Sequence, residues 1–266
     1  MEILEYGNPK NEKIILIHGF QSPYQIWDDY IDYYKNDYCV IVPILAGHNI
    51  NEKEDFVSFD ICAKELEEYY ITKYGNKVFA IYGMSMGGIL ASYIWKNKNI
   101  EIEKLILESS PLLSWNKFMT NYFTKWYLNI THKTQNRDER TIKQAIGTII
   151  SEDKVDVFLE LFDYLSDKTI INCVQEVGKF NLPSDINTPN TEIYYFYGSK
   201  INEILFRKVA HYLRKNYQNT TTICLKGKGH CEDALINPEE HIKTLNKVLK
   251  KINSNTVSYT HLTLPT

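Results

Sequence analysis

The chain has 266 residues and is 44% hydrophobic and 24% charged, which is typical of a soluble globular protein. Its 30 Lys and Arg residues nearly balance 33 Asp and Glu residues, giving a net charge of −3. Nucleic acids and acidic membrane surfaces are bound through an excess of basic residues, so this balance argues against both partners. The length fits one α/β domain of about 250 residues, and no linker-like stretch interrupts it.

The sequence carries no sign of targeting, disulfides or metal. Residues 1–13 lack the apolar stretch of a signal peptide, and no apolar run approaches the roughly 18 residues of a membrane span. We therefore expect a cytoplasmic protein. The five cysteines are odd in number and lack C-x-x-C spacing, so reduced thiols are expected, with no zinc site and no cofactor.

Short β-branched and aromatic runs alternate with longer segments of helical periodicity. The predicted strands cover residues 1–6, 13–18, 38–44, 77–83, 103–108, 192–198 and 221–226. The predicted helices between them cover residues 24–35, 58–74, 86–96, 203–216 and 238–252. Most strands are continuous apolar runs, as expected when both faces are covered. The order predicts an α/β fold with a mostly parallel central sheet and helices on both faces.

The first motif is the turn His18-Gly19-Phe20, directly after the strand at 13–18. A turn of this kind aims a backbone N–H at the place where negative charge develops on a carbonyl oxygen. We expect Phe20 to supply one such donor. His18 precedes the next motif, a position that favours a structural hydrogen bond over a role as catalytic base.

The second motif is G-x-S-x-G at residues 83–87, between the strand at 77–83 and the helix at 86–96. A serine on a sharp strand-to-helix turn has a strained backbone, and its neighbours two positions away must lack side chains for the turn to pack. The pentapeptide alone is common, but the strand-turn-helix context makes it specific. Ser85 is the exposed hydroxyl of this turn, and the N–H of Met86 is the second expected oxyanion donor.

Residues 111–189 are too long for a simple crossover and are helical in pattern, with helices predicted at 115–130, 141–150, 154–166 and 169–180. The first of these has one wide apolar face, made of Trp115, Phe118, Met119, Tyr122, Phe123, Trp126 and Tyr127. Plain packing is the commoner reason for such a stripe. Its place beside the motifs also makes Trp115, Met119 and Tyr122 candidates for binding substrate.

A late Gly229-His230 pair follows the strand at 221–226. A serine oxygen is a poor nucleophile until a base accepts its proton, and an imidazole with a pKa of about 6.5 does this near neutral pH. Of the seven histidines, His230 is the one on a loop after a late strand.

Over essentially residues 1–250 these motifs resemble, in order, the α/β-hydrolase superfamily of serine hydrolases. The resemblance implies that Ser85 is the nucleophile, that His230 is the base, and that residues 111–189 form a helical cap on a core of residues 1–110 and 190–255. The family usually places the triad's acid after the strand at 192–198. Here Glu203 is the nearest carboxylate, and Glu108, at the end of the strand at 103–108, is the alternative.

The sequence therefore predicts a serine hydrolase that cleaves a carboxylic ester, or a thioester or amide, of a small, uncharged, moderately apolar substrate through an acyl-enzyme. A non-catalytic ligand-binding relative, an acyltransferase and a C–C bond hydrolase remain alternatives. The oligomeric state is not predicted.

The last ten residues, 257–266 (VSYTHLTLPT), resemble the in-frame translation of a sequencing adapter. We expect a non-native, disordered tail there, with a natural polar tail as the alternative.

Overall fold

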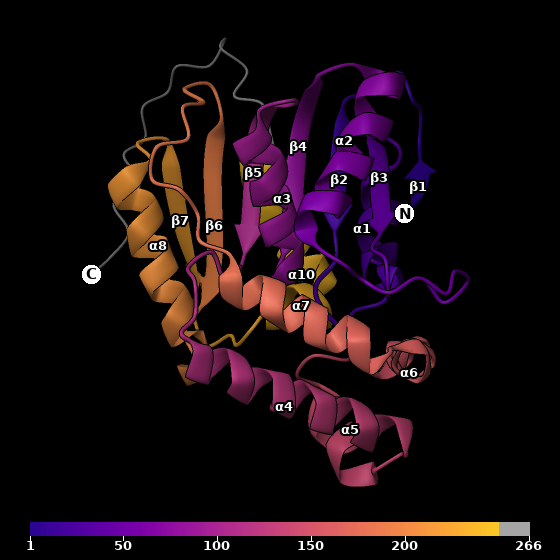
Figure 1. Cartoon of the computed structure of the whole chain (residues 1–266). Helices are drawn as coiled ribbons and strands as arrows, with labels where there is room; N and C mark the ends of the chain where they lie inside the picture. The colour runs from indigo at the N-terminus through magenta and orange to yellow at the C-terminus, as the bar shows by residue number, and fades with distance from the viewer. Residues whose placement is uncertain (250–266) are drawn as a thin grey trace.

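The computed structural model describes residues 1–249, which fold around a central seven-stranded sheet (Figure 1). The strand order is β1-β3-β2-β4-β5-β6-β7; β1 runs antiparallel to β3, and every other neighbouring pair is parallel. The strands are β1 (Glu2–Tyr6), β2 (Lys13–Ile17), β3 (Cys39–Ile44), β4 (Lys77–Met84), β5 (Glu101–Glu108), β6 (Glu192–Gly198) and β7 (Thr220–Leu225).

Both faces of this sheet are covered. Successive side chains of a strand point to opposite faces, and in β2 Ile15 and Ile17 belong to one hydrophobic cluster while Ile14 and Leu16 belong to the other. The first cluster also contains residues of α2 (Phe59–Tyr74), α3 (Met86–Asn97) and α8 (Ile204–Asn216). The second contains residues of α1 (Asp28–Tyr34) and α10 (Pro238–Leu249). The apolar runs of the strands are explained by this double coverage.

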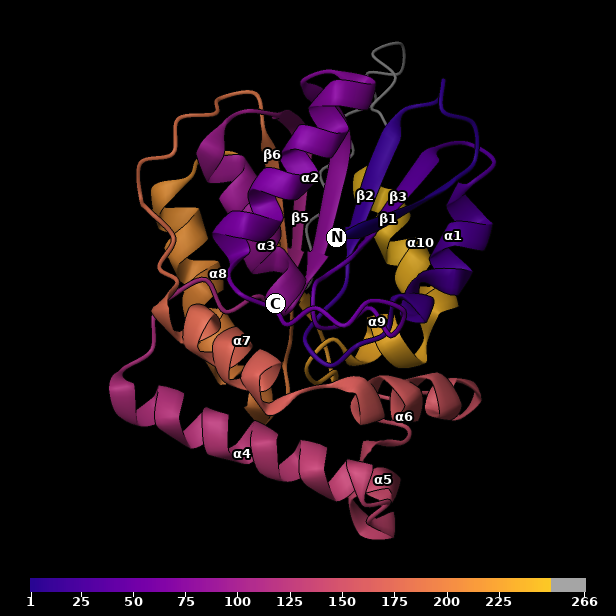
Figure 2. The ribbon, with the colours of Figure 1, turned by 45° about the vertical axis from the view of Figure 1, so that its right-hand side comes forward.

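A helical insertion separates β5 from β6. It contains α4 (Lys117–Gln135), α5 (Glu139–Ala145), α6 (Val155–Tyr164) and α7 (Asp167–Lys179). Figures 1 and 2 show these helices beyond the carboxyl ends of the parallel strands, with α4 along the outer edge of the molecule. Three short 3-10 helices, at Tyr24–Trp27, Glu152–Lys154 and Ile201–Glu203, complete the described elements together with α9 (Glu232–Ile236).

The α/β architecture predicted from the sequence is confirmed, and each of the seven predicted strands is present within a few residues of its expected bounds. The five-residue helix α9 was not predicted, because one turn gives no periodic apolar pattern. Among residues 1–249, no helix is both long and apolar enough to cross a bilayer. The adapter-like segment at 257–266 lies outside the described residues.

Candidate active site

Ser85 stands at the tip of the turn between β4 and α3. Its φ of 51° and ψ of −116° lie in a region that side-chain-bearing residues rarely adopt. A Cβ on Gly83 would lie 2.6 Å from Gly87 O, and a Cβ on Gly87 would lie 2.4 Å from Ile17 O. The glycines of the G-x-S-x-G motif therefore allow the turn to fold tightly against β2.

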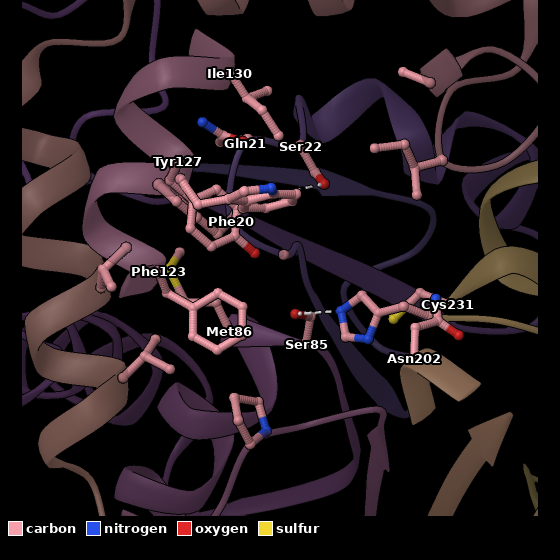
Figure 3. Close-up of a pocket in the computed structure, with 18 of the residues that line it drawn as sticks. Phe20, Gln21, Ser22, Ser85, Met86, Phe123, Tyr127, Ile130, Asn202 and Cys231 are labelled. Carbon is pink, nitrogen blue, oxygen red and sulfur yellow. Dashed lines mark hydrogen bonds between the residues drawn. The ribbon is translucent and has the colours of Figure 1, made fainter. Parts of the chain in front are cut away.

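Ser85, His230 and Glu203 form a continuous hydrogen-bonded chain. His230 Nε2 lies 2.9 Å from Ser85 Oγ, the contact drawn in Figure 3, and His230 Nδ1 lies 3.0 Å from Glu203 Oε1. The three residues come from the β4–α3 turn, the loop between β7 and α9, and the 3-10 turn after β6. Because parallel strands end at the same edge of the sheet, residues 145 positions apart meet there.

The Glu203 side chain is fully buried and accepts two further hydrogen bonds at Oε2. Ser109 Oγ donates at 2.6 Å and Gly198 N at 2.9 Å. Burial favours the neutral acid, but the bonds from His230, Ser109 and Gly198 outweigh it, so the pKa of the Glu203 carboxyl falls below its usual 4.5. A Cβ on Gly198 would lie 2.8 Å from Glu203 Cγ, so this glycine makes room for the carboxylate.

Glu108, the alternative acid, is engaged elsewhere. Its Oε2 accepts a 2.5 Å hydrogen bond from Tyr82 and lies 2.8 Å from His241 Nε2, and all three side chains are buried. His241 Nδ1 in turn lies 2.8 Å from the Tyr30 hydroxyl. The Glu108 side chain thus belongs to a polar network between the sheet, α1 and α10, while its backbone oxygen accepts from Ser85 N.

The loop after β2 passes directly over the Ser85 turn. A Cβ on Gly19 would be 3.4 Å from Ser85 Cβ. Buried His18 accepts a hydrogen bond from Leu45 N at Nε2, so it has the structural role expected from the sequence. Phe20 follows in this loop, and Met86 is the first residue of α3, where a helix leaves its N–H groups without intrahelical acceptors.

A cavity of about 920 Å³ begins at Ser85 and His230 and extends beneath the helical insertion. Its lining is mainly apolar and comes from both the core and α4–α7. Phe20, Met86, Phe123 and Tyr127 lie around its inner part in Figure 3.

Two of the three residues predicted to bind substrate, Trp115 and Met119, line this cavity, whereas Tyr122 does not and is 56% exposed. Only part of the predicted apolar face of α4 lines the cavity. Its Met119 edge points inward, whereas Phe118 and Tyr122 lie on the outward edge. Helical periodicity shows which residues share a face of the helix, but not which part of that face packs against the rest of the protein.

Residues 1–249 contain no cluster of three His, Cys, Asp or Glu side chains that could hold a metal ion. The polar groups around Ser85 are the side chains of His230 and Glu203 and the backbone of the loop after β2. This arrangement suits proton transfer and covalent chemistry at a hydroxyl group.

Residues 13–162 match the family described as the alpha/beta hydrolase fold. The match covers more than half of the chain, and the chain belongs to the α/β-hydrolase family.

Three similar proteins share between 16% and 23% of their residues with this chain. The chain is 23% identical over 222 residues to a pimeloyl-[acyl-carrier protein] methyl ester esterase of Legionella pneumophila, covering 82% of this chain and 87% of that protein. An α/β-hydrolase family protein from Desulfitobacterium hafniense superposes with a TM-score of 0.73 at 19% identity, over 94% of this chain and 100% of that one. A carboxylesterase from Nitrososphaera gargenis gives a TM-score of 0.70 at 16% identity, over 93% of both chains.

Proposed function

We propose that the protein is a serine hydrolase that cleaves carboxylic esters. The observation that carries this proposal is the pair of hydrogen bonds made by the His230 ring, 2.9 Å to Ser85 Oγ and 3.0 Å to Glu203 Oε1. The 23% identical relative is named as an ester hydrolase, which supports the same bond type.

In the proposed reaction His230 Nε2 accepts the Ser85 proton as Oγ attacks the acyl carbon. The backbone N–H groups of Phe20 and Met86 donate to the oxygen that becomes negative. The imidazolium returns its proton to the departing alcohol, which leaves an acyl-enzyme. Water, deprotonated by the same imidazole, then releases the carboxylic acid and restores Ser85.

Glu203 holds the imidazole in the tautomer with its proton on Nδ1 and stabilises the imidazolium. Its lowered pKa keeps it ionised at neutral pH. Residues 111–189 act as a cap whose helices wall the acyl site, and residues 1–110 and 190–249 form the catalytic core; residues 250–255, also expected in the core, lie outside the described part of the chain. The mainly apolar lining favours an uncharged acyl group.

The test is turnover of a panel of p-nitrophenyl esters, together with labelling by a fluorophosphonate, which reacts with an activated serine. Ser85→Ala is expected to abolish both. Ser114→Ala, which removes another hydroxyl from the cavity lining, is the matched control and should keep both. A folded wild-type protein that neither labels nor turns over any ester would favour the non-catalytic binding alternative.

A further inference from the structure

The outer surface beside the cavity is unusual in both apolarity and charge. Phe118 and Ile201 are each 82% exposed and are the most exposed large apolar side chains in residues 1–249. Four more exposed apolar side chains accompany them: Tyr122 and Trp126 on α4, and Ile204 and Leu205 on the first turn of α8. We call these six residues the apolar rim. Single exposed apolar residues are ordinary, but a group of six needs an explanation.

The rim adjoins the lining of the cavity. Asn116 and Met119, at the start of α4, line the same cavity as Leu205 and Lys208, at the start of α8. Trp126 belongs to both the rim and the lining. Leu205 of the rim is also in the lining, so a molecule bound on the rim would touch side chains of the cavity that holds Ser85.

The two helices that carry most of the rim bear charges of one sign, whereas Lys200, beside Ile201, is paired with Glu232. Helices α4 and α8 carry seven Lys and Arg residues and no Asp or Glu, although the whole chain has a net charge of −3. Lys117, Lys125, Lys133 and Lys208 are exposed and form no ion pair within residues 1–249. Asp167 of α7 approaches this face, where it contacts His132 near the other end of α4.

We propose that the apolar rim and these lysines bind the protein to an anionic lipid surface, from which an ester dissolved in the lipid enters the cavity. Phe, Tyr and Trp side chains between lysines are the combination by which a helix lies in a membrane interface. Each basic residue near an anionic surface adds attraction, and this attraction falls with added salt. That the substrate is an ester rests on the proposed function, whereas the binding to an anionic lipid surface does not.

An acidic carrier protein is the alternative occupant, and it explains less. Such a partner accounts for the lysines but not for the six exposed apolar side chains of the rim. Arginine and buried aromatic anchors dominate protein–protein contacts, whereas five of the seven basic residues on α4 and α8 are lysine. The net charge of −3, which argued against binding to an acidic membrane surface, is a sum over the whole chain. It does not reveal that the basic residues of α4 and α8 have no acidic residues among them.

The test is co-sedimentation of the full chain with vesicles of phosphatidylcholine alone, or mixed with phosphatidylglycerol. Wild type is expected to sediment with the mixed vesicles at low salt and to be released at high salt. Phe118→Ser with Ile201→Ser, and separately Lys117→Glu with Lys125→Glu, should each weaken binding at least tenfold. Val57→Ser with Ile61→Ser removes exposed apolar side chains elsewhere and should change nothing.

Catalysis is measured in parallel. The Phe118→Ser, Ile201→Ser variant should keep wild-type turnover of a soluble short ester and lose turnover of an ester embedded in the mixed vesicles. Ser85→Ala should still sediment, so a failure of ester hydrolysis with intact sedimentation counts against the proposed function alone. Absence of binding to the mixed vesicles overturns the present proposal, and so does an equal loss in the Val57 and Ile61 control. Binding of a small acidic carrier protein in place of the vesicles overturns it too.

Discussion

The Gln21 side-chain amide donates a 2.7 Å hydrogen bond to Thr131 Oγ1, joining the loop that carries Phe20 to the C-terminal part of α4. Gln21 is buried and has a φ of 57°, a conformation that costs a non-glycine residue on the order of 1 kcal/mol. Its N–H also donates to His48 Nε2 at 3.2 Å, and Phe20 packs edge-on against Tyr127 of α4. The expected oxyanion donor is therefore positioned partly by the helical insertion.

We predict that Gln21→Gly and Thr131→Val each lower kcat about tenfold with little change in KM, because a misplaced donor weakens transition-state binding. Glycine adopts the same φ without strain, so Gln21→Gly should unfold at nearly the wild-type temperature. The double variant should be no slower than either single variant. Thr131→Ser, which keeps the hydroxyl, serves as control. Effects that multiply to about a hundredfold in the double variant would mean that the two residues act independently.

The two candidate acids should respond in opposite ways when glutamine replaces them. Glu203→Gln is expected to lower kcat roughly 10³- to 10⁴-fold, because the imidazole loses the group that orients it and stabilises its charge. Glu108→Gln should leave kcat unchanged and destabilise the fold by about 3 kcal/mol, since it disturbs the buried contact with His241. Ester turnover and thermal unfolding of both variants check this. A Glu108→Gln protein that is stable but inactive would reverse the assignment.

Stability should fall between pH 7 and pH 5. Burial lowers the pKa of His18 to about 4, and burial together with the neighbouring His18 lowers the pKa of His48 to about 3. Both rings accept a backbone N–H at Nε2, which requires the neutral form. Below pH 6.5 the unfolded chain binds protons that the folded state does not, so the free energy of unfolding drops, by about 4 kcal/mol at pH 5 for the two groups together.

Urea unfolding at pH 7 and pH 5 measures this slope. His48→Gln keeps an acceptor near Gln21 N but does not titrate, so its slope should be about half that of wild type. The lowered pKa of Glu203 gives stability that is present above pH 4.5 and lost below it, outside this range. An unchanged slope in His48→Gln would show that His48 does not contribute.

The strands were predictable because each is a short apolar run, and a parallel sheet then brings the ends of β4, β6 and β7 to one edge. This topology alone is enough to bring Ser85 near His230. The choice between Glu203 and Glu108 was not predictable in the same way. Both lie where a strand ends at that edge, and they differ in which side-chain partners lie around them.

Those partners are distant in the sequence. Ser109 bonds to Glu203 across 94 positions, and His241 reaches Glu108 from α10. The Gln21–Thr131 contact spans 110 positions and has no motif to signal it. Periodicity likewise marked the apolar stripe of α4 but left open which of its edges meets the cavity, so it did not show that Tyr122 lies outside the cavity lining.

The size and lining of the cavity predict a preference for longer acyl chains. A volume of about 920 Å³ exceeds what a short acyl group fills, and each buried CH₂ contributes about 0.8 kcal/mol, or roughly fourfold in kcat/KM. For soluble p-nitrophenyl esters, kcat/KM should therefore rise with chain length until the cavity is full. Met119→Trp, which adds bulk inside the cavity, should shift the optimum to shorter chains. Tyr122→Trp, three residues along the same helix but outside the lining, should leave the profile unchanged. A profile that is highest for acetate and falls steadily would indicate that the acyl chain does not occupy this cavity.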